Sequence, residues 1–529
     1  MKHMAWFCLA SLLAFAGCDS DAGPRCQDVE SQCENGMLLS CDEATGELAP
    51  ATACETGNIC RGTACEPISA EMLDSGNALA QYAQAIEDYT AQMTLDISGP
   101  LLAAQNQYYI SDGSAFAFAT AVMAIFNASY QGHTLIGFDT PGNGDCNRNA
   151  GSPFAFSLDS YFGACTRIAG DDIVVTYVAP DPEVNRMALG KGDRIVALKT
   201  LGSENLTGQA LLDRLAATPL CQWSVPNDSA RLDTAAANLF AVLEPGEVIS
   251  VVSPSGDTRD ITVPARSDWI GCYDGASRPE FNDEMFKAYQ RPDGVVIVVM
   301  STFGSHPDHP FPSPLNVAAY TQWIAESIEL VTAAITAFED VTGLVYDVRG
   351  NRGGAQEYAM ALLAQLPATE GAIGNCYARV PMSSPPTFSD EAEYPFPYDF
   401  LAGDVLPPPP ITALGNIRQA VVTDGFSASA TDWMAHYAQM HDIPVIGRPA
   451  SGSYGYRVNS SFVVKDIAPV NANTPGIYNY ISGARCLDGA GMPLEGVSSV
   501  DVAVELNAND VANGVDTQLE AAAALVLAP

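Results

Sequence analysis

The second half of the sequence alternates short apolar runs with longer segments of helical periodicity, which limits the folds open to the chain. Val- and Ile-rich runs that end in turn residues occur at 294–300, 343–348 and 419–423. Apolar residues at helical spacing mark 316–339 and 431–440. Strands that alternate with helices pack as layers. The sequence therefore predicts a layered α/β core over residues 267–529.

The region before this core has two different patterns. Residues 70–130 carry Ala, Leu, Tyr, Ile and Met at helical spacing, which predicts a helical segment over 69–170. Strand-like runs, a helix-like stretch and a hairpin follow, and they predict a β-rich domain over 171–266 with an insertion at 218–244. With 47% apolar and 16% charged residues, the 529-residue chain is globular and multidomain.

The β-rich segment contains a short motif. The letters ALGKGDRIVAL resemble the Gly-Asp turn and strand of a PDZ domain. A PDZ-like domain would bind an extended peptide as an added strand. The other interpretation of the segment is a generic small β-domain.

The cysteines predict disulfides. When Cys8 and Cys18 of the N-terminal signal are set aside, 12 of the 14 cysteines remain, and six of these lie within residues 18–68, a stretch too small for a core of its own, which predicts a disulfide-bonded module. They are Cys26, Cys33, Cys41, Cys54, Cys60 and Cys65. Six others are scattered over the rest of the chain. Pairing by order gives Cys146–Cys165, Cys221–Cys272 and Cys376–Cys486, although sequence alone does not determine connectivity.

The N-terminus has the pattern of an export signal. An apolar run is followed by Phe15-Ala16-Gly17-Cys18, which resembles a bacterial lipobox. The resemblance implies a signal peptide over 1–17 and a lipid on Cys18. The alternative is an ordinary signal peptide cut nearby. Both place the protein outside the cytoplasm, in the bacterial cell envelope, and the first gives it a lipid anchor there, in the periplasm or at the outer membrane.

The charge excludes one class of partner. Lys and Arg number 24 against 62 Asp and Glu, for a net charge of -38. So acidic a surface repels the phosphates of nucleic acids, and the sequence contains no basic run to offset it. Nucleic acid is therefore not an expected partner.

A candidate nucleophile stands between a strand and a helix. Ser429 lies near the end of the loop 424–430, just before the helical segment that begins at about Thr431. A helix N-terminus offers free N–H groups and a positive dipole end to an oxyanion. Gly353 and Gly354 follow another strand and could bring a second N–H group, because glycine lets a carbonyl approach closely. Taken alone, these features also fit an N-cap and an ordinary turn.

In combination, three segments resemble one family. GLVYDVRGNRGG, AVVTDGFSASATDWMAHY and IPVIGRPASG are similar, in this order, to the core of the tail-specific (C-terminal processing) serine peptidases. The resemblance runs from about residue 70 to the end. It implies that Ser429 is the nucleophile, with Ser427 as its neighbour, and that the N–H groups of Ala430 and Gly354 form the oxyanion hole.

The same resemblance decides the general base. One branch of the family uses a lysine, but Ser453 stands at its position. The tricorn-like branch uses a histidine ahead of the PDZ-like domain, and His133 fits that place. Histidine acts as a base near neutral pH without much tuning. A glutamate near the C-terminus assists in that branch, and Glu495 fits its position.

The remaining polar candidates have structural interpretations. His306 and His309 have a spacing that could suit a metal, but without a third ligand they read as a surface loop. His436 is predicted to pack against its neighbours or lie at the surface, and Asp347 is predicted to have a structural role rather than a catalytic one. Asp432 suits the dipole at the start of the helix.

The sequence therefore predicts an extracytoplasmic serine endopeptidase that cuts peptides or unfolded proteins through an acyl-enzyme, without a metal or an organic cofactor. The predicted fold is α/β (α+β) and multidomain. The alternative is a catalytically inactive relative that binds a peptide or a hydrophobic ligand at the cell surface.

Overall fold

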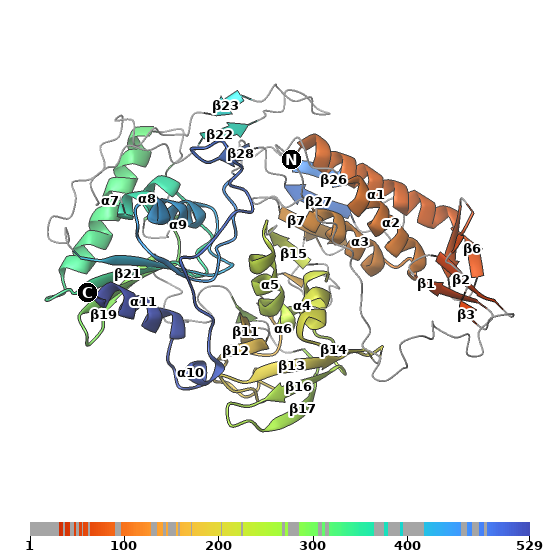
Figure 1. The fold of residues 1–529 in the computed structure, drawn as a ribbon, viewed down its shortest axis with the longest axis horizontal. Coiled ribbons are helices and arrows are strands. Elements are labelled where there is room, and N and C mark those ends of the chain that lie inside the picture. The colour runs from red at the N-terminus through yellow and green to blue at the C-terminus, as the bar shows by residue number, and fades with distance from the viewer. Residues whose placement is uncertain are drawn as a thin grey trace.

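A computed structural model gives the fold of the chain (Figure 1). It describes residues 31–34, 37–42, 47–48, 52–55, 57–61, 64–89, 97–128, 135–140, 144–145, 155–156, 159–170, 172–202, 204–218, 220–223, 226–266, 270–272, 285–304, 309–310, 312, 317–363, 375–378, 392–394, 417–455, 463–467, 476–480 and 484–528. The expected signal segment 1–17 lies outside these residues, as do Cys18, His133 and Cys146.

The cysteine-rich segment forms small antiparallel sheets. β2 pairs with β1, β3 and β4, and β5 pairs with β6. The strands are β1 (Ser31–Glu34), β2 (Met37–Asp42), β3 (Glu47–Leu48), β4 (Thr52–Ala53), β5 (Asn58–Arg61) and β6 (Ala64–Pro67). Disulfides join Cys33 to Cys60 and Cys54 to Cys65. So short a segment buries little apolar surface, and the crosslinks stabilise it instead.

Three helices follow, as the apolar spacing predicts. They are α1 (Ala70–Tyr89), α2 (Ser98–Ile110) and α3 (Ala115–Ala128). Their shared core contains large buried side chains such as Tyr82, Tyr108 and Phe126. Figure 1 shows these helices between the cysteine-rich strands and the rest of the molecule.

A second sheet joins segments that are far apart in the sequence. Its strand order is β26-β27-β7-β15-β9, and β8 also pairs with β7. The strands are β7 (Leu135–Thr140), β8 (Gly144–Asp145), β9 (Ala155–Phe156), β15 (Leu220–Trp223), β26 (Val463–Ile467) and β27 (Gly476–Tyr480). Phe138 of β7 is buried in the core of the three helices. The sheet therefore connects the helical segment to the C-terminal part of the chain.

The β-rich domain is a sheet of order β11-β12-β13-β16-β17, with β14 beside β13. Its strands are β11 (Ala164–Ala169), β12 (Asp172–Val178), β13 (Arg194–Lys199), β14 (Asn205–Thr207), β16 (Val248–Val252) and β17 (Thr258–Thr262). Its helices are α4 (Gly208–Ala216), α5 (Asp228–Ala237) and α6 (Leu239–Val242). The short strands β10 (Asp159–Ser160) and β18 (Ile270–Gly271) pair with each other next to it.

This domain corrects one boundary. The sequence assigned residues 69–170 to a helical segment, but β7 to β11 lie within that range, and β11 is part of the β-rich sheet. The strand β11 is buried along nearly its whole length. A short strand buried on both faces lacks the alternation that distinguishes strand from helix, so its sequence does not reveal it.

The core sheet has the order β19-β20-β21-β24-β25-β29, and its strands are parallel except for β19. They are β19 (Phe286–Gln290), β20 (Val295–Met300), β21 (Gly343–Asp347), β24 (Gln419–Thr423), β25 (Val445–Gly447) and β29 (Val502–Ala503). Figure 1 shows α7 (Val317–Thr336), α8 (Gln356–Leu363) and α9 (Ala430–Met440) on one side of this sheet. The helix α11 (Thr517–Leu527) covers the other side, and the short α10 (Ala508–Ala512) precedes it.

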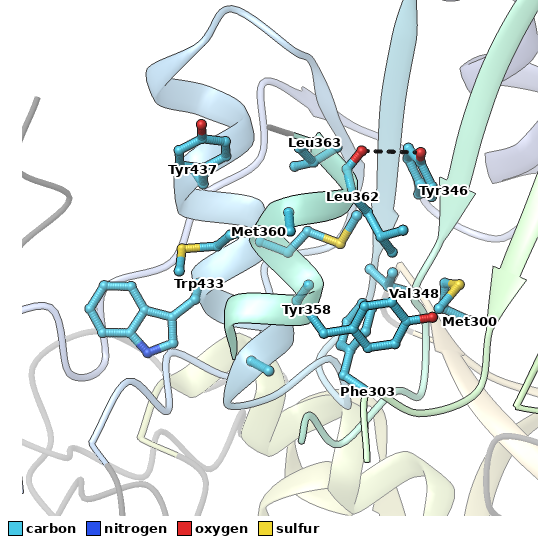
Figure 2. Close-up of a cluster of buried hydrophobic side chains, with 14 of the residues drawn as sticks. Met300, Phe303, Tyr346, Val348, Tyr358, Met360, Leu362, Leu363, Trp433 and Tyr437 are labelled. Carbon is cyan, nitrogen blue, oxygen red and sulfur yellow. Dashed lines mark hydrogen bonds between the residues drawn. The ribbon is translucent and has the colours of Figure 1, made fainter. Parts of the chain in front are cut away.

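The strand β20 shows why the core is layered. Val296, Val298 and Met300 pack against α7, α8 and α9, whereas Val295 and Ile297 pack against α11. Because helices cover both faces, the strand is apolar throughout, as in other parallel sheets. Figure 2 shows the first of these layers, in which Tyr358 contacts the ring of Phe303 edge-on at 5.5 Å.

The disulfides correct two predicted pairs. Cys165 bonds to Cys272, so neither Cys146–Cys165 nor Cys221–Cys272 forms. The reason is topological: the fold brings Cys272, which directly follows β18, next to Cys165 on β11, although the two are 107 positions apart in sequence. Cys376 bonds to Cys486, the third predicted pair. It crosslinks β22 (Asn375–Ala378) and β28 (Ala484–Leu487) in a small sheet that β23 (Ala392–Tyr394) completes.

None of the helices in the described part of the chain is long and apolar enough to cross a membrane.

Candidate active site

Ser429 lies between the parallel strand β24 and the helix α9, in a strained backbone conformation. Its φ is 60° and its ψ is −116°, and it is the N-cap residue of α9. A positive φ is uncommon for a residue other than glycine and costs energy, so the surrounding structure must impose it. Several hydrogen bonds around the loop provide that constraint.

The loop before Ser429 is closed by Asp424 and Ser427. Asp424 Oδ1 accepts hydrogen bonds from the N–H groups of Gly350, Phe426 and Ser427, at 2.9, 3.0 and 3.1 Å. The Ser427 hydroxyl donates to the carbonyl oxygen of Val348 at 2.9 Å. Ser427 is fully buried and holds the loop to the strand end that carries the glycine pair.

Gly353 lies directly against Ser429, and Gly354 lies against Phe303. A Cβ on Gly353 would lie 2.5 Å from Ser429 Cβ and 2.8 Å from the nitrogen of Ala430. Gly354 has a φ of +137°, and a Cβ there would lie 2.2 Å from the carbonyl carbon of Phe303. No real Cβ tolerates contacts this short with backbone, so both positions require glycine.

Two backbone N–H groups near Ser429 are available to a ligand. The N–H of Gly353 donates to Asn351 Oδ1 at 2.8 Å. By contrast, within the described ranges the N–H groups of Gly354 and Ala430 have no hydrogen-bond acceptor. These are the two groups that the sequence assigns to an oxyanion hole; Ala430 is buried, whereas Gly354 is exposed to solvent.

Asp432 is the centre of the hydrogen bonds that fix Ser429. Its Oδ2 accepts the N–H of Ser429 and the N–H of Ser453, both at 2.8 Å, and the hydroxyl of Ser451 at 3.1 Å. Its Oδ1 accepts the N–H of Gly452 at 2.8 Å. The sequence had given Asp432 only a role toward the helix dipole. The signal that could have revealed more is the capping-box spacing of Ser429 and Asp432.

Burial raises the pKa of Asp432 from 3.8 to about 7, although these four hydrogen bonds lower it. The carboxyl is fully buried, so its charged form loses hydration. Ser453, where the resemblance would place the lysine of the other branch, belongs to the same network, because its N–H donates to Asp432 and its hydroxyl oxygen lies 2.7 Å from that of Ser451.

The raised pKa of Asp432 gives a testable pH dependence. Between pH 3.8 and about 7 the folded protein keeps a proton that the unfolded chain releases. This contribution to stability is complete below the unfolded pKa and is lost as pH rises toward about 7. Relative to Asp432→Asn, we expect the wild-type free energy of unfolding to fall by roughly 1 kcal/mol per pH unit in that window.

Urea unfolding at several pH values measures the difference in free energy of unfolding between wild type and Asp432→Asn. Both proteins contain the other titrating groups, so the contributions of those groups cancel in the difference. Glu329→Gln, which changes an exposed carboxyl on α7, is the matched control. A difference between wild type and Asp432→Asn that stays constant with pH would contradict the prediction.

Glu495 lies beside the turn that Asp432 holds. Its Oε2 accepts the N–H of Gly455 at 2.7 Å, and the N–H of Gly496 donates to the carbonyl oxygen of Gly452 at 2.8 Å. Burial, Asp432 and Glu495 together raise the pKa of Tyr454. The structure therefore brings Glu495 to the same turn as Asp432, although the two are far apart in sequence.

The described histidines have packing roles. His309 Nε2 lies 2.9 Å from the Ser327 hydroxyl, and its ring stacks on Trp323. His436 packs edge-on against the rings of Trp433 and Tyr454. Nowhere in the described ranges do three His, Cys, Asp or Glu residues gather in a way that could hold a metal ion. His306 and the predicted base His133 are outside those ranges.

A serine at a strained strand–helix junction, in contact with Gly353, is the kind of arrangement that a serine hydrolase uses. Residues 297–474 match the sequence model of peptidase family S41. This match lies within the α/β core and the segment that follows it, and it supports a serine-type peptidase activity.

Two solved structures have a fold similar to that of this chain. The structure of mature CPAF complexed with lactacystin is 12% identical, with a TM-score of 0.54, and the match covers 87% of this chain and 98% of that one. The structure of a serine-to-alanine mutant of CPAF is 12% identical, with a TM-score of 0.57, covering 87% and 97%. At this identity the likeness shows the fold alone. Among curated proteins, no sequence matches this chain.

Proposed function

We propose that this protein is an extracytoplasmic serine endopeptidase that cleaves peptides or unfolded proteins through an acyl-enzyme, with Ser429 as nucleophile and His133 as general base. The observation that carries the proposal is the geometry at Ser429. Its positive φ places it at the start of α9, against Gly353 and beside the N–H groups of Gly354 and Ala430.

In the proposed reaction, the Ser429 hydroxyl oxygen attacks the scissile carbonyl carbon while its proton moves to the His133 imidazole. The carbonyl oxygen becomes an oxyanion that accepts hydrogen bonds from the N–H groups of Gly354 and Ala430. The C–N bond then breaks, and the leaving amine takes the proton from the imidazolium. Water, deprotonated by the same imidazole, hydrolyses the ester and releases the second product.

His133 is supported by its sequence context, immediately ahead of β7. The first residue of β7, Leu135, pairs with Trp223 at the end of β15. Three residues later, Pro226 lies against Gly496, the residue that follows Glu495. There the carbonyl oxygen of Pro226 lies 2.8 Å from where a Cβ of Gly496 would be. We propose Glu495 as the group that assists the base.

The location and substrate class follow from the sequence. The proposed lipid on Cys18 would anchor the enzyme to a membrane of the cell envelope, and the segment 18–68 would be a separate disulfide-bonded module. The β-rich domain is proposed to be PDZ-like, so that extended peptides are its natural ligands.

A fluorophosphonate probe tests the proposal. We expect the folded, oxidised protein to form one covalent adduct, and mass spectrometry of the peptide to locate it on Ser429. Protein denatured before exposure is the control and should not react. If the folded protein does not react, the proposed function is wrong, and the inactive ligand-binding relative becomes the better interpretation.

A further inference from the structure

The helix α5 lies in the segment that the sequence treats as an insertion, and the proposed reaction does not use it. One side of α5 is part of the β-rich domain, where Ala235 and Ala236 are buried in the core. The hydroxyl of Thr166 on β11 donates to the carbonyl oxygen of Ala236 at 2.7 Å. The helix is therefore attached to the edge strand of that sheet.

The other side of α5 touches the loop that carries Ser429. The N–H of Gly425 donates to Asp233 Oδ2 at 2.8 Å. A Cβ on Gly425 would lie 2.4 Å from Asp233 Oδ2 and 2.7 Å from the Cα of Ala230. Glycine at position 425 thus lets the helix and the loop approach to backbone contact.

Asp233 is also half of a buried ion pair. Arg448 Nε lies 2.7 Å from Asp233 Oδ1, and the side chains of Asp233 and Arg448 are 3% and 11% exposed. Burial raises the pKa of Asp233 to about 7, Arg448 lowers it and Asp424 raises it. Arg448 also pairs with Glu505. The buried carboxyl of Asp233 thus lies between the Arg448 cation and the N–H of the loop residue Gly425.

The start of α5 reaches the other flank of the site. Asn227, the N-cap residue, donates through Nδ2 to the carbonyl oxygens of Ala450 and Ser451 at 2.8 and 2.7 Å. Ser451 in turn donates to Asp432, which accepts the N–H of Ser429. One helix from the β-rich domain therefore contacts both segments that fix the nucleophile.

We propose that Asp233 is a positioning residue. It holds the Gly425 N–H, and through it the loop, so that Ser429 keeps its position beside the proposed oxyanion hole. This proposal rests on the proposed role of Ser429. It assigns to the β-rich domain a part of the active-site framework, contributed across 192 positions of sequence.

The test compares Asp233→Ala, which removes the acceptor, with Asp233→Asn, which keeps an acceptor oxygen for Gly425. We expect Asp233→Ala to slow fluorophosphonate labelling about tenfold or more and to lower kcat, with KM for a peptide substrate unchanged. Asp233→Asn should recover most of the labelling rate. Asp228→Ala, an exposed carboxylate on the same helix, should leave it unchanged.

Two further variants exclude simpler explanations. The double variant Asp233→Ala with Arg448→Met removes both charges of the ion pair. Its labelling rate should stay low if the slow labelling of Asp233→Ala comes from the lost acceptor. The rate should recover if the slow labelling comes only from an unpaired arginine. Asp233→Glu keeps the charge but displaces the acceptor, so it should also be slow. It is the fallback if Asp233→Ala does not fold.

Hydrogen exchange provides a readout that needs no activity. Amides of residues 424–429 should exchange faster in Asp233→Ala than in wild type, with the remainder of the core sheet unchanged. Wild-type labelling rate together with wild-type exchange in this segment would overturn the proposal. If wild type does not label at all, the proposed function fails, and the exchange experiment alone decides the role of Asp233.

Discussion

Ser429→Ala is expected to abolish peptide hydrolysis and fluorophosphonate labelling, with a loss of about 10⁶-fold in kcat. Alanine lacks the oxygen that forms the acyl bond, and no other described serine lies at a strained helix start facing the glycine pair. The fold should persist, because the N–H that donates to Asp432 Oδ2 at 2.8 Å remains. Labelling, hydrolysis assays and thermal melting measure the three expectations.

Ser427→Ala is the matched control, because it changes a serine two positions away in the same loop. Its hydroxyl bonds to the carbonyl oxygen of Val348, so we expect a less stable protein that still reacts with the probe. If the two variants behaved the other way round, the assignment of the nucleophile would be wrong. His133→Ala should resemble Ser429→Ala in hydrolysis, and an unaffected His133→Ala would exclude the proposed base but not the nucleophile.

Gly353→Ala is expected to have the second-largest effect, a loss of at least about 100-fold in labelling and kcat. The new methyl group would lie 2.5 Å from Ser429 Cβ, 2.7 Å from the carbonyl oxygen of Ala428 and 2.8 Å from the Ala430 nitrogen. It would displace the nucleophile and cover one of the two available N–H groups. The oxyanion hole would then lose its geometry while the sheet and its cores stay intact.

The control for Gly353→Ala must place an alanine at a similar positive φ, but at a position where the new Cβ contacts no other atom. Gly491 has a φ of +81° and nothing within 4 Å of its would-be Cβ, so Gly491→Ala meets this requirement. We expect Gly491→Ala to lower the melting temperature slightly and to keep full labelling. Equal labelling losses in both variants would mean that strain, rather than contact with Ser429, explains the effect.

Local patterns predict the core because its strands and helices are strongly apolar. The runs at 294–300, 343–348 and 419–423 correspond to β20, β21 and β24, and the helical spacing at 316–339 corresponds to α7. Helices cover both faces of these strands, so most of their residues are apolar, and each strand appears in the sequence as an almost continuous apolar run. The helices α1 to α3 are predicted for a similar reason, since each turns one buried face to the same core.

Features that depend on contacts distant in sequence are not predicted. The bond between Cys165 and Cys272 follows from the position of β11 next to β18, which no local spacing encodes. The strand β11 itself is buried too uniformly to be distinguished from a helix. For the same reason the sequence gives no indication that α5 contacts the loop before Ser429, because Asp233 and Gly425 meet only in the folded chain.

By itself, the sequence determined that a layered α/β core is present and that Ser429 and Gly353-Gly354 each lie in a turn that follows a strand, because short-range periodicity and turn residues encode both. Only the tertiary structure decided how the serine is held. Its strained φ depends on Asp432 and on a turn more than twenty residues later, and its loop contacts Asp233 from another domain. The hydrogen-bond partners of a buried carboxyl cannot be predicted from the sequence, because they come from distant segments that share no periodic pattern.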